Sequence, residues 1–218
     1  MPRVAAAPGR PRKAAQRWPT LRYERRLWQQ GIVHIAGADE AGRGALAGPV
    51  YAAAVILPNT IARQLKGVRD SKQMTAAERE ELAPRIREHA LAWAVASASV
   101  EEIEDINILQ ASHLATRRAL EALRIPPQHL LLDAVRLTTV DLPQTPLVGG
   151  DARCLSISAA SVLAKTERDA ELCRLDALFP QYGFAEHKGY ATPAHREAIA
   201  THGPCAHHRR SFAPMRAV

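Results

Sequence analysis

The chain has 218 residues, of which 47% are hydrophobic, and this suits one domain with a sizeable core. No apolar run approaches the roughly 20 residues that cross a bilayer, and the basic N-terminus lacks the apolar stretch of a secretory signal. Three widely spaced cysteines predict free thiols in a reducing compartment. We therefore expect a cytoplasmic protein with no membrane association.

The net charge of +7 comes entirely from the N-terminus. Residues 1–26 hold eight basic side chains and one acid, so the other 192 residues hold 21 basic and 21 acidic groups. Residues 1–20 are rich in Ala, Pro and Arg and have no hydrophobic period, which predicts a disordered basic leader before a domain at 21–218. Such a leader either attracts nucleic acid in a salt-sensitive manner or is only a solvated extension.

The predicted elements alternate between helices and apolar strands. Thr75 and Glu78 form a capping-box pattern, and Pro84 should kink the helix that follows or shift its boundaries. In chain order we expect a helix at 21–30, strands at 32–36 and 50–57, a helix from 75, a strand at 91–100, a helical turn at 101–106, a helix at 107–123, strands at 130–133 and near 146–148, and helices at 156–179 and from 193.

Residues 37–49 organise the chain. Asp39 and Glu40 follow an apolar run, and three glycines and a proline within residues 42–49 force the backbone to turn. Carboxylates beside an amide-rich loop suit a metal-assisted phosphate site, because acids hold cations and glycines let N–H groups approach a sugar-phosphate. Neighbouring strand residues point to opposite faces, so the two acids share one site only if the strand bends.

Two further acids stand near strand ends, Asp133 after the run 130–132 and Asp151 after a short strand. If Asp39, Glu40, Asp133 and Asp151 come together, they repel and raise one another's pKa, which divalent cations relieve. Oxygen-only ligands favour Mg²⁺ or Mn²⁺. Two such ions about 3.5–4 Å apart can activate water and stabilise the leaving oxygen in the hydrolysis of a phosphodiester. Five histidines between 187 and 208 lack the spacing of a zinc site.

The string Asp-Glu-Ala-Gly-Arg-Gly at 39–44, with Gly-Pro at 48–49, closely resembles the signature of type 2 ribonucleases H, in particular bacterial ribonuclease HII. Further similar strings are Asp-Ser-Lys at 70–72, residues 106–111, residues 158–165, Gly-Tyr-x-Thr at 189–192 and His-Arg-x-Ser-Phe at 208–212. The resemblance covers about 21–212. Two positions depart from it: Ala134, where the family often has Gly, and Gly149, where Lys is common.

The resemblance implies an α/β ribonuclease H-like fold, a mixed five-stranded sheet flanked by helices with a C-terminal helical substrate-binding segment. Its first three strands would be antiparallel neighbours and the later two would pair parallel. It also implies Mg²⁺- or Mn²⁺-dependent hydrolysis of RNA in RNA–DNA hybrids. Single ribonucleotides embedded in duplex DNA would be cut on their 5′ side, leaving 3′-hydroxyl and 5′-phosphate ends, in ribonucleotide removal. We expect a monomer. The alternatives are the sister type, ribonuclease HIII, and a binding protein on this fold that has lost catalysis.

The resemblance also assigns roles to single residues. The four acids would be the catalytic metal ligands. Gly42, Arg43 and Gly44 would contact the ribonucleotide 2′-hydroxyl together with Tyr190, which is otherwise a core or lid aromatic. Lys72 would lie near substrate phosphate. Asn107 and Gln110, three apart on one predicted helix face, either donate to phosphate or are ordinary exposed amides. For Lys165, Arg168 and Asp169 we favour ion pairing on a helix surface.

Overall fold

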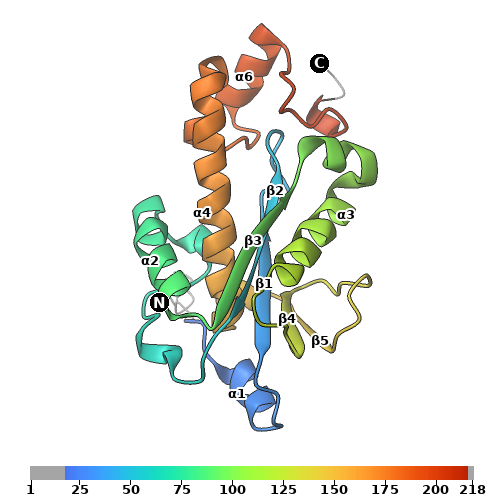
Figure 1. Cartoon of the computed structure of the whole chain (residues 1–218). Helices are drawn as coiled ribbons and strands as arrows, with labels where there is room; N and C mark the ends of the chain where they lie inside the picture. Colours follow the sequence, from blue (N-terminus) through green and yellow to red (C-terminus); the bar gives the residue numbers. More distant parts are fainter. Residues whose placement is uncertain (1–17, 216–218) are drawn as a thin grey trace, which may run out of the picture.

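The computed structural model describes residues 18–215 (Figure 1). Residues 1–17 of the predicted leader lie outside the described residues. Thr20, which we placed in that leader, pairs with the body instead: its N–H donates to the Arg153 carbonyl at 3.1 Å, and its carbonyl accepts from the Leu155 N–H at 3.1 Å. In residues 18–215 no helix is both long and apolar enough to cross a membrane.

A five-stranded mixed sheet with the order β3-β2-β1-β4-β5 forms the centre of the molecule (Figure 1). The first three strands are antiparallel neighbours, β4 runs parallel to β1, and β5 runs parallel to β4, as predicted. The strands are β1 (Ile35–Ala41), β2 (Val50–Ile56), β3 (Ala92–Ala98), β4 (His129–Asp133) and β5 (Gln144–Leu147).

Helices cover both faces of this sheet. α4 (Leu155–Leu178) packs against β1 and β2 on one face, with α2 (Ala76–His89) beside it. α3 (Val100–Glu121) packs against β2 and β3 on the other face. The approach of α4 is close, because a Cβ on Gly37 of β1 would stand 2.3 Å from the backbone of Ser156. The remaining helices and 3-10 turns are α1 (Arg22–Trp28), α5 (Phe184–His187), α6 (Pro193–His202), η1 (Ile61–Arg63), η2 (Ser71–Gln73), η3 (Gly150–Ala152), η4 (Pro180–Tyr182) and η5 (Ala213–Met215).

Three local features bear on the sequence predictions. β1 continues to Ala41, so Asp39 and Glu40 lie inside the strand and not beyond its end, because pairing with β2 outweighs the low strand propensity of the residues around them. The Thr75–Glu78 capping box is present, but α2 runs unbroken through Pro84. α3 is interrupted at Asn107, whose φ of 68° and ψ of 164° separate the predicted helical turn from the longer helix.

Candidate active site

The acids of β1 and β4 lie in the middle of the sheet. Although they are neighbours in one strand, Asp39 and Glu40 line the same narrow hollow, and Asp133 at the end of β4 lines it too. Asp151 belongs to η3, and that turn is tied to β4 because the Gly150 N–H donates to Asp133 Oδ1 at 2.7 Å. The structure therefore brings the four predicted acids into one region.

The acids repel one another. Burial raises the pKa of Asp39 well above its ordinary value, and the charges of Glu40 and Asp133 raise it further, while a hydrogen bond with Ser161 acts in the opposite sense. Burial also raises the pKa of Asp133, aided by Asp151 and Glu40 and opposed by the Gly150 N–H. This is the mutual repulsion that we expect of carboxylates assembled without cations.

Lys72 neutralises part of this negative charge. Its Nζ lies 3.2 Å from Asp151 Oδ2, and its side chain is 73% exposed, whereas that of Asp151 is 8% exposed. Burial alone would lower the pKa of Lys72, but Asp151 and Asp39 raise it above the ordinary value. Two contacts hold the lysine's turn in place: Asp70 Oδ1 accepts the Lys72 N–H at 2.9 Å, and the hydroxyls of Ser71 and Ser161 lie 2.8 Å apart. Lys72 thus remains open to a second anion from solvent.

The donor chemistry fits a hard divalent cation. Within residues 18–215 no three Asp, Glu, His or Cys side chains converge as a finished metal site. Two of the four carboxylates are instead paired with protein cations, Glu40 with Arg43 at 3.0 Å and Asp151 with Lys72. Four oxygen-only acids, with the pKa raised at Asp39 and Asp133, are nevertheless the ligand set that Mg²⁺ or Mn²⁺ prefers.

In the glycine turn (residues 42–49), which follows β1, the fold requires glycine at Gly42 but not at Gly44. Gly42 has a φ of 98°, and a Cβ there would stand 1.9 Å from Arg168 Nε, so the protein itself requires glycine. Gly44 has no left-handed φ, and a Cβ on it would meet nothing within 4 Å. Among the eleven glycines within residues 18–215, only Gly44 has neither constraint. Nothing within residues 18–215 requires glycine at 44, so we attribute any requirement for glycine there to a bound ligand.

Tyr190 lies beside this turn. The carbonyl of its neighbour Gly189 accepts the Leu46 N–H at 2.8 Å. The Tyr190 ring is 37% exposed, and it lies over α4, 5.6 Å from Lys165 Nζ and 5.4 Å from the Arg168 guanidinium carbon. Tyr190 is therefore partly exposed and not buried in the core, and its role as a substrate contact or a lid aromatic stays a prediction.

Asn107 and Gln110 do not share a helix face. Asn107 adopts a positive φ, which asparagine tolerates better than most residues, and its Oδ1 accepts the N–H groups of Leu109 at 3.0 Å and Gln110 at 3.2 Å. It is the N-cap of the longer half of α3. Asn107 is not helical, so the predicted shared helix face is wrong. The cap uses only the Asn107 oxygen, and donation to phosphate by the exposed Asn107 and Gln110 amide groups stays a prediction.

On α4, the predicted ion pairing is confirmed for Lys165 and Asp169 but is wrong for Arg168. Lys165 Nζ lies 2.5 Å from Asp169 Oδ1, and Arg79 lies 3.0 Å from the other oxygen, so the predicted ion pairing holds for Lys165 and Asp169. Arg168 is fully buried and donates to backbone carbonyls, so the surface prediction is wrong for it. A second fully buried arginine, Arg209, had no assigned role, although it stands in the His-Arg-x-Ser-Phe string.

Two buried histidines near Tyr190, His195 and His208, form a hydrogen-bond network rather than a zinc site. Backbone partners fix their tautomers: His195 Nδ1 donates to the Tyr190 carbonyl at 2.9 Å, and the Cys205 N–H donates to His208 Nδ1 at 3.0 Å. His208 Nε2 must then donate to His195 Nε2, 3.1 Å away, with both rings neutral. Burial lowers the pKa of each to about 4. His187 stacks on His195 with ring centroids 4.2 Å apart.

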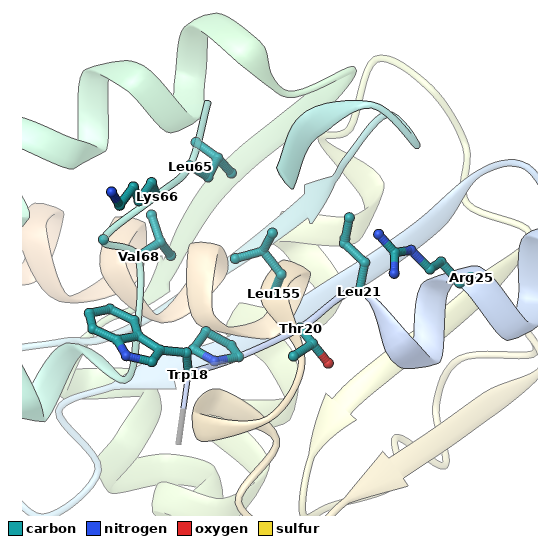
Figure 2. Close-up of a pocket in the computed structure, with 10 residues that line it drawn as sticks. Trp18, Thr20, Leu21, Arg25, Leu65, Lys66, Val68 and Leu155 are labelled. Atoms are coloured by element: carbon teal, nitrogen blue, oxygen red, sulfur yellow. The ribbon is translucent and has the colours of Figure 1, made fainter. Parts of the chain in front are cut away.

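A larger hollow of about 600 Å³ lies elsewhere, between α1, the start of α4 and the segment before η2 (Figure 2). Figure 2 shows apolar side chains lining it, including Trp18, Leu65 and Leu155, with Arg25 and Lys66 as its cations. None of the predicted site residues lines this hollow. The size of a hollow therefore does not identify the site.

The sheet order, the helices on its two faces and the acids at its centre define a nuclease of the ribonuclease H fold. The family model for Ribonuclease HII matches residues 36–215. Ribonuclease HII of Moorella thermoacetica is 55% identical over 190 residues, which cover 87% of this chain and 91% of that protein. The chain therefore belongs to the ribonuclease HII family and is a ribonuclease H endonuclease, as its sequence predicts.

Solved structures agree with this assignment. The ribonuclease H2 from Pyrococcus horikoshii OT3 matches with a TM-score of 0.70 at 27% identity, over 84% of this chain and 95% of that one. Bst-RNase HIII in complex with Mn²⁺ matches with a TM-score of 0.67 at 19% identity, over 87% and 70%. The second likeness shows the shared fold alone.

Proposed function

We propose that this protein is a divalent-metal-dependent endonuclease that cuts the RNA strand of RNA–DNA hybrids and cuts 5′ of single ribonucleotides embedded in duplex DNA. The products carry 3′-hydroxyl and 5′-phosphate ends, and the reaction serves ribonucleotide removal in the cytoplasm by a monomeric enzyme. One observation carries the proposal: a partly buried cluster of mutually repelling acids lies next to a glycine turn in which Gly44 faces open space.

Asp39, Glu40, Asp133 and Asp151 hold Mg²⁺ or Mn²⁺ in this proposal. The bound ions supply an activated water and stabilise the leaving oxygen. Asp39 is 5% exposed, so its charge has little help from solvent and depends on a cation. Lys72 leaves Asp151 for a substrate phosphate, which its exposed position allows.

The glycine turn recognises the 2′-hydroxyl, which is the chemical mark of a ribonucleotide in DNA. Within residues 18–215 the N–H groups of Arg43 and Gly44 donate no hydrogen bond to the protein, so both are free to bind an oxygen of the substrate. The Tyr190 ring stacks on the neighbouring sugar. The basic leader at 1–20 and the C-terminal helical segment contribute non-specific affinity for the duplex.

Asparagine substitution tests the acid assignment. Asp39→Asn and Asp133→Asn should each lower cleavage of a duplex with one ribonucleotide by more than about a hundredfold in Mg²⁺. An amide keeps the shape and removes the ligand charge, and it also removes repulsion, so the melting temperature should stay constant or rise. Asp141→Asn, an exposed acid of the same chemistry, is the matched control and should keep full activity.

Full activity in either purified, folded site variant would show that the acids are not the metal ligands. The binding-protein alternative makes a different prediction. It requires the unaltered protein to bind the same duplex and to leave it uncut in both Mg²⁺ and Mn²⁺.

A further inference from the structure

Two arginines with no exposed surface converge on the glycine turn. Arg168 comes from α4, and Arg209 comes from the segment after α6; both are 0% exposed. Within residues 18–215 neither guanidinium forms an ion pair with a carboxylate. Burying two cations without acidic partners costs stability, so a role in stabilising the fold is by itself a poor explanation for the two buried arginines.

All of the acceptors of these arginines are backbone carbonyls. Arg168 donates to Ala47, Pro49 and Lys188, at 3.1, 3.3 and 2.9 Å. Arg209 donates twice to Gly48, from Nε at 2.9 Å and from Nη2 at 2.7 Å, and its Nη1 donates to the carbonyl of Arg43 at 3.0 Å. The backbone on each side of Arg209 also pairs with the turn: the Arg209 N–H donates to the Leu46 carbonyl at 2.8 Å, and the His207 carbonyl accepts the Gly48 N–H at 2.8 Å.

The contact to the Arg43 carbonyl has a directional consequence. The chain has no cis peptide bond in residues 18–215, so the carbonyl of Arg43 and the N–H of Gly44 point in opposite directions in one planar unit. Arg209 binds the carbonyl on the buried side. The Gly44 N–H must therefore point away from Arg209, toward the side where a Cβ on Gly44 would meet no protein atom within 4 Å.

We propose that Arg209 is a positioning residue that aims the Gly44 N–H at the 2′-hydroxyl of the substrate, and thereby sets the discrimination between ribonucleotide and deoxynucleotide. This inference rests on the proposed function of the glycine turn. Arg168 supports the same turn at its far end, through Ala47 and Pro49. The C-terminal segment, which contains no catalytic acid, thus governs which nucleotide the acids act upon.

The test compares two constants in one cleavage assay with Mg²⁺: the KM for a duplex with one embedded ribonucleotide, and the Ki of the same duplex made entirely of DNA. Arg209→Lys keeps the charge but cannot reach both carbonyls, so the Gly44 amide loses its direction. The ratio of Ki to KM should fall about three- to tenfold, the effect of one lost hydrogen bond, while Ki changes by less than about twofold.

Arg210→Lys is the matched control, because Arg210 is the exposed neighbour and carries the same charge. It should leave the ratio of Ki to KM unchanged. The ratio does not depend on how much of a preparation is folded, so lost stability alone cannot imitate the expected result. A wild-type ratio retained by Arg209→Lys would overturn the role of Arg209 and leave the proposed function standing. A wild-type enzyme with a ratio near one would instead refute recognition of the 2′-hydroxyl by the glycine turn, and a wild-type enzyme that leaves the duplex with one ribonucleotide uncut would refute the proposed function.

A second variant covers the case in which Arg209→Lys does not fold. The Phe212 ring lies 5.2 Å from the Arg209 guanidinium carbon, so Phe212→Leu loosens the guanidinium without removing its hydrogen bonds. The ratio of Ki to KM should fall in the same direction by about twofold. An unchanged ratio in this variant, with Ki also unchanged, counts against the proposal.

Discussion

Alanine at Gly42 and at Gly44 should have opposite effects on stability and on recognition. At Gly42 an L-residue with positive φ costs about 1–2 kcal/mol. Its Cβ would also stand 1.9 Å from Arg168 Nε, so the guanidinium must move and weaken its three bonds to carbonyls, each worth about 1.5–3 kcal/mol for a charged donor. We expect Gly42→Ala to lose about 4 kcal/mol or more of unfolding free energy. For a chain of this size that is about 8–16 °C in melting temperature.

Gly44→Ala should behave differently, because its methyl group meets no protein atom within 4 Å. The melting temperature should stay within about 2 °C of wild type, or rise slightly because alanine restricts the unfolded chain. The methyl group instead occupies the space in front of the turn, so cleavage of a duplex with one ribonucleotide should fall about tenfold or more. Thermal denaturation and steady-state cleavage measure the two effects. Equal melting temperatures for the two variants would refute the packing argument, and full activity of Gly44→Ala would refute the assignment of Gly44 to the substrate.

Three further predictions concern neighbouring residues. Ala134→Gly should raise the unfolding free energy by about 0.5–1 kcal/mol in urea titrations, because Ala134 has a φ of 59°; an unchanged midpoint would mean that the left-handed backbone is not strained. Tyr190→Ala should lower cleavage at a single embedded ribonucleotide about tenfold, and lower cleavage of a continuous RNA–DNA hybrid less, while Tyr190→Phe keeps most activity; equal losses on both substrates would make the ring a packing residue. His195 and His208 remain neutral in the folded state down to a pKa of about 4, so the unfolded chain alone takes up their protons as the pH falls below about 6.5. Stability due to these histidines is therefore complete above pH 6.5 and should decrease by about 1.4 kcal/mol per pH unit for each histidine on the way to pH 4. Asp39 and Asp133 act in the opposite sense, so the comparison that isolates the histidines is the pH slope of His208→Gln, which should be shallower than that of wild type.

Most of the fold was predictable, because apolar runs and glycine or proline breaks mark its strands. The limits of β1 were not, since Asp39 and Glu40 join the strand only through pairing with Ala53 and Ala52 of β2, a contact invisible in local sequence. Of the two departures from the family pattern, Gly149 has a local explanation, because its backbone is left-handed, whereas Ala134 has left-handed backbone too and nothing in the structure explains alanine there.

Residues of the candidate site could be predicted from the sequence where the residue type itself indicates the chemistry. Four carboxylates, a glycine turn and an aromatic were found because each has a distinctive string around it. Arg168 and Arg209 were not found, because an arginine on a helix or in a polar tail normally lies on the surface. Their burial depends on carbonyls more than 100 residues away, at 119 residues for Arg168 and Pro49 and 161 residues for Arg209 and Gly48. The helical placement of Asn107 was wrong for a related reason, because its positive φ and its cap are set by local backbone geometry that residue spacing does not show.

The hydrogen bonds from Arg209 to the glycine turn also impose an order on how the enzyme matures during its synthesis. Polypeptides leave the ribosome N-terminus first, and the acids, the sheet and α4 all precede residue 179. The turn lies early in the chain, at 42–49, but five of its hydrogen bonds are made by residues 207–209. A nascent chain can therefore assemble its acidic centre while the turn still lacks its partners, and the turn takes its final shape only after residue 209 has been made.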